Sequence, residues 1–448
     1  MKQTIIVGAG PSGLAAGYYL SKNKRNVVLL EKDSLVGGLS KTIPYKGCYF
    51  DVGGHRFFTD IPEVEALWQE ILGDRLLKRS RTSRIFYRGK FFNYPLNLVN
   101  ILSNISLVNS GYCFLSYLVS QLTLSQKTDS FEDYIVRHFG KRLYKIFFKG
   151  YTEKVWGISC SDLSCDWASE RIKGLSLIAS FTAALGLNGH IRTLIKEFYY
   201  PVLGPGMMYE AMAERIKNLG AHIEMNTEVI RIMHDSKKII SVITRDKEGR
   251  EQESFGADFI FSMPITELVN KFCPLPPDNI LEATRKLCYR DLLVVNLICA
   301  NENVFPDNWI YVHSPEVKVS RIQNYKNWSP AVVPELKKTT LGLEYFCSAK
   351  DEFWKKDDKE IGNIAALELK YLGFNTTIED SFVYRAPQAY PIYTLGYKEA
   401  VGVLKGYLGL FSNLALIGRA GRFQYDNMDS AISSGINAAK QVINLKTP

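Results

Sequence analysis

The sequence predicts an α/β protein with three parts: a discontinuous domain of strands and helices, a largely helical segment, and a mixed or antiparallel sheet. Three observations support this prediction. The chain opens with a buried strand, a glycine-rich turn, a helix and a second strand that ends in an acidic residue, all within residues 4–31. A strand, a glycine and a helix follow one another again over residues 414–443, and residues 285–350 alternate short strand-like runs. At 448 residues the chain is long enough for two or three domains.

The opening strand leads into the pattern G-x-G-x-x-G at residues 8–13. In this pattern Gly8 allows a tight turn, Gly10 lets the backbone approach a pyrophosphate, and Gly13 lets the following helix lie close on the sheet. The helix N-terminus then presents N–H groups and the positive end of its dipole to the anion. Strand, glycines, helix, second strand and terminal acid in register predict a Rossmann-type dinucleotide site rather than a glycine-rich turn without a ligand.

Glu31 closes the second strand, Val27–Leu30. A carboxylate at this place can accept hydrogen bonds from ribose hydroxyls, and it disfavours a 2′-phosphate. NADP is therefore not expected at this site. The chain also shows no second G-x-G-x-x-G for a nicotinamide cofactor.

Two further loops favour FAD over NAD. Gly37 and Gly38 continue from the acid and resemble the extended fingerprint of glutathione-reductase-like FAD proteins, in which this loop passes near the flavin side. Residues 50–58, FDVGGHRFF, resemble the flavin-facing loop of the amine oxidase and protoporphyrinogen oxidase superfamily. Within it, His55 resembles the Gly-Gly-His of UDP-galactopyranose mutases of the eukaryotic type, which implies a place beside the flavin. The residues expected to bind the cofactor are Gly8, Gly10, Pro11, Ser12, Gly13, Glu31, Lys32, Gly38, Leu39, Gly54, His55, Val229, Gly418, Arg419 and Met428.

The composition favours an anionic partner. The net charge is +9, which suits a diphosphate or an anionic membrane surface. Part of that charge lies in a basic run at residues 78–88, for which a solvated loop is the simpler interpretation. No nucleic-acid-binding signature occurs, so a nucleic-acid partner is not expected. Eight cysteines without a C-x-x-C pair or a His cluster indicate a reduced, cytoplasmic protein with no metal site, and no signal peptide is expected.

Residues 96–124 come nearest to a membrane segment. Asparagine and glutamine interrupt their apolar residues, and no run of about 18 apolar residues exists, so no spanning helix is expected. Two short helices that cover a substrate site are the favoured interpretation. A helix lying in the membrane interface beside the basic run, with peripheral membrane contact, is the alternative.

These signals divide the chain. Residues 1–60, 200–270 and 410–448 are expected to form the discontinuous FAD-binding domain of glutathione-reductase-like Rossmann type. Residues 61–199 are expected to form a largely helical substrate or cap domain, and residues 271–409 a mixed-sheet substrate domain.

Particular elements are predicted within these ranges. Residues 131–140 and 141–150 are helix candidates, and a further helix is expected from Pro205 to about Gly220. The runs His222–Val229 and Ile239–Thr244 predict strands.

Residues 150–157, GYTEKVWG, carry a second specific signal. They closely resemble the Tyr-Thr-x-Lys-x-Trp-Gly segment of UDP-galactopyranose mutases. Arg171 follows Trp156 at the same offset as a diphosphate-binding arginine of the eukaryotic-type mutases. A guanidinium suits this role because it offers paired donors to phosphate oxygens and stays charged, and a surface salt bridge to a neighbouring glutamate is the alternative. Arg321, before a Trp-Ser-Pro turn, resembles the other diphosphate arginine of that family.

The C-terminal part resembles the mutases in a Tyr-Pro loop and in a Gly-Arg-x-Gly segment, residues 418–421, that leads into the last helix. Tyr390 and Tyr425 can bond phosphate or sugar through their hydroxyls, and Arg422 is a candidate third cation. The residues expected to act in catalysis are His55, Arg171, Arg321 and Tyr390, and those expected to bind substrate are Tyr151, Trp156, Arg171, Arg321, Tyr390, Arg422 and Tyr425.

The resemblance implies a flavoenzyme that interconverts the pyranose and furanose forms of a nucleotide sugar. In that mechanism the flavin is reduced, by NAD(P)H or a reductase, and its N5 forms an adduct with the sugar as the diphosphate leaves. No side-chain nucleophile is needed, in keeping with the lack of an evident Ser-His-Asp or Cys-His set. The rival is an oxidase or dehydrogenase of the amine oxidase or protoporphyrinogen oxidase type, which the FAD signals fit equally well, and a flavin-bearing binding protein is a third class.

Overall fold

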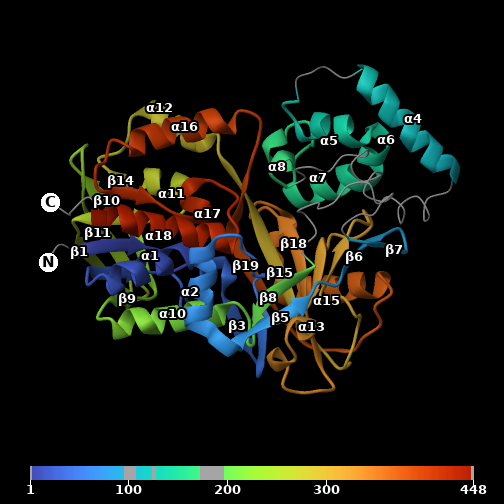
Figure 1. Ribbon diagram of the computed structural model, residues 1–448, viewed down its shortest axis with the longest axis horizontal. Helices are drawn as coiled ribbons and strands as arrows, with labels where there is room; N and C mark the ends of the chain where they lie inside the picture. The colour runs from blue at the N-terminus through green and yellow to red at the C-terminus, as the bar shows by residue number, and fades with distance from the viewer. Residues whose placement is uncertain (1–2, 95–106, 124–127, 172–195, 445–448) are drawn as a thin grey trace.

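The computed structural model describes residues 3–94, 107–123, 128–171 and 196–444. Figure 1 shows a part built of strands and helices on the left, which holds both ends of the chain, a second sheet on the right and a group of helices above that sheet. The predicted α/β fold, with parallel and mixed sheets, is confirmed.

A five-stranded parallel sheet forms the centre of the first part. Its strands, in spatial order, are β20 (Leu414–Leu416), β13 (Asp258–Phe261), β1 (Gln3–Val7), β2 (Asn26–Leu30) and β9 (His222–Glu224). Each neighbouring pair is parallel. Strands β1, β2 and β13 are nearly continuous apolar runs because other elements cover both faces of the sheet. Three distant parts of the chain therefore meet in one sheet.

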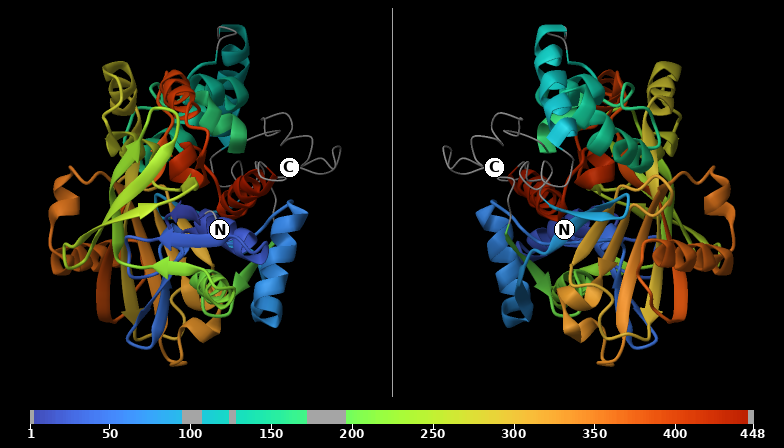
Figure 2. Two further views of the ribbon diagram at one scale, coloured as in Figure 1. Left: turned by 90° about the vertical axis from the view of Figure 1, so that its left-hand side faces the viewer. Right: turned by 90° about the vertical axis from the view of Figure 1, so that its right-hand side faces the viewer.

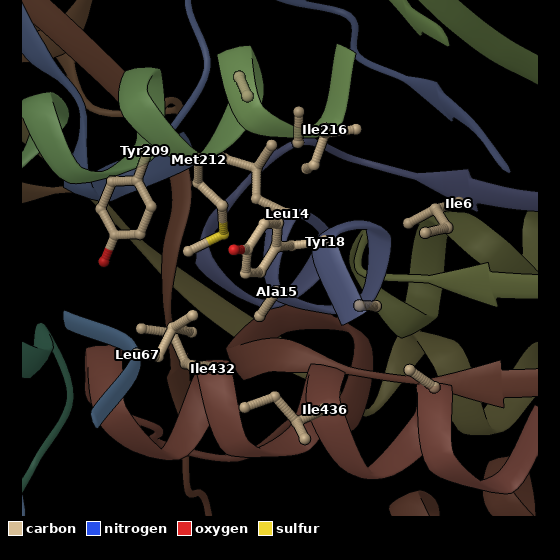
Figure 3. Close-up of a cluster of buried hydrophobic side chains, with 14 of the residues drawn as sticks. Ile6, Leu14, Ala15, Tyr18, Leu67, Tyr209, Met212, Ile216, Ile432 and Ile436 are labelled. Atoms are coloured by element: carbon tan, nitrogen blue, oxygen red, sulfur yellow. The ribbon is translucent and has the colours of Figure 1, made fainter. Parts of the chain in front are cut away.

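Four helices pack together over one face of this sheet: α1 (Pro11–Lys22), α2 (Pro62–Leu72), α10 (Gly206–Asn218) and α18 (Met428–Asn444). Figure 3 shows Leu14 and Tyr18 of α1 between Met212 of α10 and Ile432 of α18. Gly435 brings α18 close to α1, because a Cβ at this position would lie only 2.0 Å from the Ser12 carbonyl oxygen. This close contact fixes the position of α18 relative to α1.

A four-stranded sheet packs on the other face. Its order is β12 (Glu251–Phe255), β11 (Ile239–Asp246), β10 (Thr227–His234) and β14 (Phe272–Cys273). The helices in the same core are α11 (Ile265–Asn270), α12 (Asp278–Arg285) and α16 (Tyr397–Leu408). This layer closes the apolar core on the second side of the parallel sheet.

The prediction of one strand over His222–Val229 is wrong, because this run supplies two strands in two different sheets. Strand β9 ends at Glu224 and pairs with β2, whereas β10 begins at Thr227 and pairs with β11. Between them, Asn226 has φ +55°, a left-handed conformation that asparagine tolerates better than most residues. The turn redirects the chain, although the apolar pattern runs through it.

The second part contains a seven-stranded sheet. Its strands, in spatial order, are β19 (Ile378–Ile392), β15 (Cys288–Cys299), β18 (Thr339–Cys347), β17 (Arg321–Asn324), β16 (Trp309–Val312), β6 (Ser83–Tyr87) and β7 (Lys90–Asn93). All neighbouring pairs are antiparallel except β16 and β6, which makes the sheet mixed. Helix α15 (Asp358–Tyr371) packs on one face, and short helices α13 (Tyr325–Trp328) and α14 (Glu352–Lys355) fill the connections. The short helix α17 (Gly418–Arg422) belongs to the first part, where it links β20 to α18.

Strands also occur in the range that the sequence indicates as largely helical. Besides β6 and β7, strand β5 (Leu76–Ser80) pairs with β8 (Glu197–Pro201), and the hairpin of β3 (Thr42–Tyr45) and β4 (Cys48–Asp51) lies upstream. The basic run at residues 78–88 forms parts of β5 and β6 rather than a solvated loop. Its cations pair with acids far along the chain, as when Arg84 bonds Asp307, and local sequence cannot show such partners.

The helices above the second sheet are α4 (Leu107–Thr123), α5 (Phe131–Phe139), α6 (Lys141–Leu143), a π-helix (Tyr144–Lys149), α7 (Gly150–Trp156) and α8 (Cys165–Arg171). Helix α5 agrees with its prediction and begins with a capping box between Ser130 and Asp133. The second candidate, residues 141–150, is mostly a π-helix that continues into α7. Of the two short helices expected over residues 96–124, residues 107–123 form one helix and residues 95–106 lie outside the described residues. Among the helices that the structure describes, none has the length and apolarity needed to cross a membrane.

Candidate active site

A cavity of about 640 Å³ lies between the five-stranded and seven-stranded sheets. The turn after β1, the end of β2 and the loop at residues 38–41 line one end. The loop at residues 54–58 and the strands β16 and β17 line the other, together with residues 384–390 of β19. The start of α18 and the turn after β20 complete the wall. Elements from the whole length of the chain thus enclose one site.

The glycine-rich turn has the geometry that its sequence predicts. Gly8 has φ +98°, and a Cβ on it would lie 2.1 Å from Ser262 Oγ. Gly13 lies beneath the turn, where a Cβ would lie 1.8 Å from the Gly8 carbonyl oxygen. Glu31 braces the same turn, because its carboxylate accepts hydrogen bonds from the N–H groups of Ala9 at 2.7 Å and Asp33 at 2.9 Å. Of the residues expected to bind the cofactor, all except Gly13 line the cavity.

The shape of this end fits a dinucleotide pyrophosphate. Gly38 faces Gly10, and a Cβ on Gly38 would lie 3.3 Å from the Gly10 Cα, so the absence of side chains keeps the passage open. Gly418 has φ +69° and approaches α1 so closely that a Cβ would lie 2.5 Å from Ser12 Oγ. Helices α1 and α18 both begin at the cavity, where Met428 lines it, and each presents the positive end of its dipole. The residues present therefore suit FAD.

Arg321 lies at the other end, fixed by a buried carboxylate. Arg321 on β17 stands opposite Glu344 on β18, and its guanidinium donates a hydrogen bond to that carboxylate. Glu344 is fully buried and also accepts from Gln323 Nε2 at 2.6 Å and from the Gly54 N–H at 3.2 Å. Burial lowers the pKa of Arg321, but Glu344 and the neighbouring Tyr390, Tyr151 and Tyr311 together outweigh it and raise that pKa well above its ordinary value. The guanidinium is charged at any working pH.

His55 lines the cavity between two arginines. Burial and the positive charges of Arg419 and Arg321 lower its pKa to about 3. Its Nδ1 lies 3.2 Å from the Gly53 carbonyl oxygen, so in the neutral ring Nδ1 carries the hydrogen and donates it. This leaves Nε2 as a hydrogen-bond acceptor. At neutral pH, His55 is a polar but uncharged group.

Two tyrosines and an arginine form a stack on the cavity wall. The rings of Tyr390 and Tyr425 lie 5.5 Å apart at 19°. The Arg419 guanidinium lies 4.9 Å from the Tyr390 ring centre and 4.7 Å from that of Tyr425. It also donates to the carbonyl oxygens of Asp426 at 2.9 Å and Ala389 at 3.4 Å. Arg419 is thereby held as a second cation in the cavity, where sequence reasoning assigned it to the cofactor alone.

Tyr151 and Trp156 do not line the cavity. The Tyr151 ring stacks on His313 with ring centres 4.1 Å apart. Trp156 is buried against Trp167, with ring centres 4.6 Å apart. Trp156 packs within the helical group, whereas Tyr151 packs against the sheet below it, with its ring centre 6.2 Å from that of Tyr311. The motif at residues 150–157, which resembles a mutase segment, here supplies packing side chains rather than residues of the cavity wall.

Lys154, in the same motif, holds a loop in place. Its Nζ donates to the carbonyl oxygens of Val312, Ser314 and Val319 at 3.1, 3.0 and 2.8 Å. Burial lowers its pKa to about 8. These bonds tie α7 to the loop that leads into β17, and so to the strand that carries Arg321.

Arg422 and Arg171 are the other two arginines predicted to bind substrate. Arg422 bonds Asp426 Oδ2 at 3.3 Å and Gln424 Oε1 at 2.6 Å, and it does not line the cavity. Arg171 is the last residue of α8, and its side chain lies outside the described part of the structure.

These positions can be compared with known proteins. A family model described as flavin containing amine oxidoreductase matches residues 11–443. The chain belongs to this family. It is accordingly a flavoenzyme of the amine oxidase superfamily with FAD as its cofactor, in agreement with the cavity.

This flavoenzyme resembles several proteins of different activity. It is 30% identical over 173 residues to a probable UDP-galactopyranose mutase of Klebsiella pneumoniae, an alignment that covers 36% of the chain and 43% of the relative. It is 25% identical over 346 residues to an L-amino acid oxidase of Cerastes cerastes, covering 73% of the chain and 63% of the relative. The chain therefore spans less than two thirds of the length of the curated relatives that it matches.

Solved structures agree on the fold over the whole chain. A reduced UDP-galactopyranose mutase superposes with a TM-score of 0.86 at 20% identity, covering 100% of this chain and 95% of that one. A putative protoporphyrinogen oxidase from Exiguobacterium superposes with a TM-score of 0.78 at 16% identity, covering 99% of both chains. At these identities the likeness establishes the fold alone.

Sequence reasoning missed several residues of the flavoenzyme's cavity. Lys41 lies in the wall, pairs with Asp33 and stands 5.6 Å from the Tyr384 ring centre. Arg56 lies 5.9 Å from the ring centre of Trp309. Lys41 lies just after the Gly37–Gly38 pair, and Arg56 directly follows the Gly-Gly-His segment. A search for lysines and arginines next to these two loops would have found both residues.

Proposed function

We propose that this flavoenzyme is a mutase that interconverts the pyranose and furanose forms of a nucleotide-activated sugar, without net redox change. The observation that carries the proposal is the pair Arg321 and Arg419, two guanidinium groups that line the same cavity as the dinucleotide turn and both act on the pKa of His55. A nucleotide sugar brings a diphosphate that must be bound and released. Paired guanidinium groups are the protein's best partner for that charge.

Arg321 is suited to hold the diphosphate in one orientation. Its pairing with the buried Glu344 fixes the guanidinium plane, since Gln323 and the Gly54 N–H hold that carboxylate in turn. A fixed cation needs no reorganisation when negative charge develops on the departing phosphate. Arg171 remains a predicted partner for the same diphosphate.

The stack of Arg419 on two tyrosines also favours an anionic substrate. Amine substrates are commonly held as ammonium ions over open aromatic faces. Here Arg419 already lies over the rings of Tyr390 and Tyr425 and would repel a second cation. The Tyr390 hydroxyl is a candidate donor to phosphate or sugar oxygens.

Neutral His55 fits a reaction without side-chain acid catalysis. Its Nε2 accepts rather than donates a hydrogen bond, which suits a sugar hydroxyl or a cofactor N–H. The chemistry that bound FAD supplies in such a mutase is a nucleophilic ring nitrogen, present only in the reduced state. The electrons for that state would come from NAD(P)H or a reductase.

An oxidase or dehydrogenase acting on an amine or a polycyclic substrate is the second candidate. Its support is the family match and the likeness to the L-amino acid oxidase over 73% of the chain. The two candidates differ in whether the flavin changes oxidation state during turnover.

The deciding experiment uses the purified FAD-bound protein without oxygen. Reduced protein is mixed with UDP-galactopyranose and related nucleotide sugars, and the products are followed by NMR while the flavin absorbance is recorded. We expect a ring-contracted product from reduced protein only, with no net flavin oxidation. Reduction of the oxidised flavin by an amine or polycyclic donor, with no product from any nucleotide sugar, would establish the second candidate.

A further inference from the structure

Helix α4 presents an apolar face to solvent. Six large side chains on one broad side of this helix are exposed: Tyr112, Phe114, Leu115, Leu118, Val119 and Leu122. Leu122 is 87% exposed, and Leu115 and Val119 are 57% and 56% exposed. We call this set the α4 outer face. A contiguous apolar patch on a folded protein marks an interaction surface far more often than chance.

The opposite side of α4 is already packed. Cys113 and Tyr117 are buried, and Ser120 with them, against α5 and α6. Gly140 lies so close that a Cβ on it would stand 2.8 Å from the Tyr117 Cα. The Ser116 hydroxyl also accepts the Arg142 N–H at 3.1 Å. The helix therefore sits on the protein with its more apolar side outward, the reverse of an ordinary surface helix.

The helical segments next to α4 are rich in cations. Residues 107–123 contain no charged side chain, whereas residues 134–150 contain five lysines and arginines and no acid. Two of these residues contact α4, and a third lies in α6, which packs on α4. Arg137 accepts a bond from Gln121 at its carbonyl oxygen, Arg142 lies 5.2 Å from the Tyr112 ring centre, and Lys141 lies between them in sequence, exposed. Long cationic side chains beside an apolar face suit a boundary between hydrocarbon and anionic headgroups.

We propose that the α4 outer face docks on an anionic lipid bilayer and holds this flavoenzyme at a membrane surface. Figure 1 shows α4 at the outer edge of the helical group, where a flat surface can reach it. A second copy of the chain fits less well, because a two-fold contact across this face would bring Arg137, Lys141 and Arg142 of both copies together. Anionic headgroups neutralise the same charges. The proposal does not depend on the mutase chemistry.

The test is co-sedimentation of the FAD-bound protein with lipid vesicles. One vesicle contains phosphatidylcholine alone, and the other an equimolar mixture with phosphatidylglycerol. We expect binding to the anionic vesicles that weakens with added salt. The triple variant Leu115→Ser, Val119→Ser, Leu122→Ser is expected to lose about tenfold or more in partitioning, because it removes apolar area that would enter the bilayer. Lys141→Glu is expected to weaken binding to anionic vesicles only.

A matched control comes from helix α15, where Leu367 and Tyr371 are 68% and 64% exposed. The double variant Leu367→Ser, Tyr371→Ser is expected to bind vesicles like the unaltered protein. Retained FAD absorbance shows that each variant is folded. Absence of unaltered protein from both vesicle pellets would overturn the proposal. So would a dimer in light scattering that the triple variant converts to a monomer, since the face would then join two copies of the chain.

Discussion

Arg321 and Glu344 face each other across two neighbouring strands, and the carboxylate of this pair is fully buried while the guanidinium reaches the cavity. Through the same carboxylate, the Gly54 N–H of the Gly-Gly-His loop is tied to Arg321. The loop expected beside the flavin and the cation expected at the diphosphate are therefore joined through one carboxylate. A change at either residue of the pair should affect both the guanidinium and the Gly-Gly-His loop.

Replacing Glu344 by glutamine tests this coupling. The amide keeps the shape but removes the charge that holds Arg321, so we expect about 1–3 kcal/mol lower free energy of unfolding and a weaker affinity for UDP. Urea unfolding and calorimetric UDP titration measure the two effects. The control Glu352→Gln alters an exposed pair with Lys355 and should change stability by less than about 0.5 kcal/mol. Equal behaviour of the two variants would refute the coupling.

Arg419 and Arg422 provide a matched pair of cations. Arg419→Lys keeps the charge but loses the planar stacking on Tyr390 and Tyr425, so the dissociation constant for UDP should rise about tenfold or more. Arg422→Lys, outside the cavity, should change it by less than about threefold. The measurement is UDP titration of the FAD-bound protein. A larger effect at Arg422 would support the sequence-based prediction that this residue is a third substrate cation.

His55 should not titrate in the physiological range. With its pKa lowered to about 3 by burial, Arg419 and Arg321, its imidazole should stay neutral between about pH 5 and 8. NMR of labelled histidine, with His55→Gln to assign the signal, measures this directly. In Arg419→Ala the same signal should shift toward titration at higher pH. An imidazole that titrates near its ordinary pKa in the unaltered protein would contradict the geometry.

Asp51 should make stability depend on pH. Burial raises its pKa to about 7, although hydrogen bonds from Tyr200 and Thr42 favour the ionised form. A carboxyl whose folded pKa exceeds its unfolded pKa stabilises the fold at low pH, and this contribution is lost as pH rises from about 4 through 7. Asp51→Asn removes that loss.

Relative to the unaltered protein, the Asp51→Asn variant should therefore gain about 1–3 kcal/mol between pH 5 and pH 8. Urea unfolding at the two pH values gives this difference. Asp246→Asn is the control, because hydrogen bonds from the Arg250 N–H and guanidinium lower that pKa despite some desolvation. Asp246 is ionised across this range in both the folded and the unfolded protein. The difference in free energy of unfolding between Asp246→Asn and the unaltered protein should therefore stay constant. A gain in free energy of unfolding for Asp246→Asn as large as that for Asp51→Asn would contradict the assignment of this pH dependence to Asp51.

Glycines in helices α1 and α4 should respond oppositely to alanine. Gly13→Ala places a Cβ 1.8 Å from the Gly8 carbonyl oxygen, so we expect loss of FAD and about 2–4 kcal/mol of destabilisation. Gly111, in α4, has no atom within 4 Å of such a Cβ, and its alanine variant should be stabilised by up to about 1 kcal/mol. FAD absorbance after gel filtration and thermal unfolding measure both. Retention of FAD by Gly13→Ala would contradict the close packing.

The dinucleotide end of the cavity could be predicted because its signals are local. A left-handed turn at Gly8, a close approach at Gly13 and an acid at the end of β2 each follow from a few neighbouring residues. The start of the last helix at Met428 could be predicted for the same reason. The burial of Trp156 could not be predicted, because an aromatic residue in a helix looks the same in sequence whether it faces a core or a cavity.

The sequence by itself determined the strand, helix and strand of residues 4–31, the identity of the cofactor and the family. These depend on backbone conformations that only particular residues allow. Only the tertiary structure decided which cations share the cavity, because Arg321 lies on β17 of one sheet, whereas Arg419 follows β20 of another sheet almost a hundred residues later. It also decided that Arg422 and Tyr151 lie outside the cavity wall, and that α4 keeps its apolar side outward. Such choices rest on contacts between distant segments, whose partners no local pattern can name.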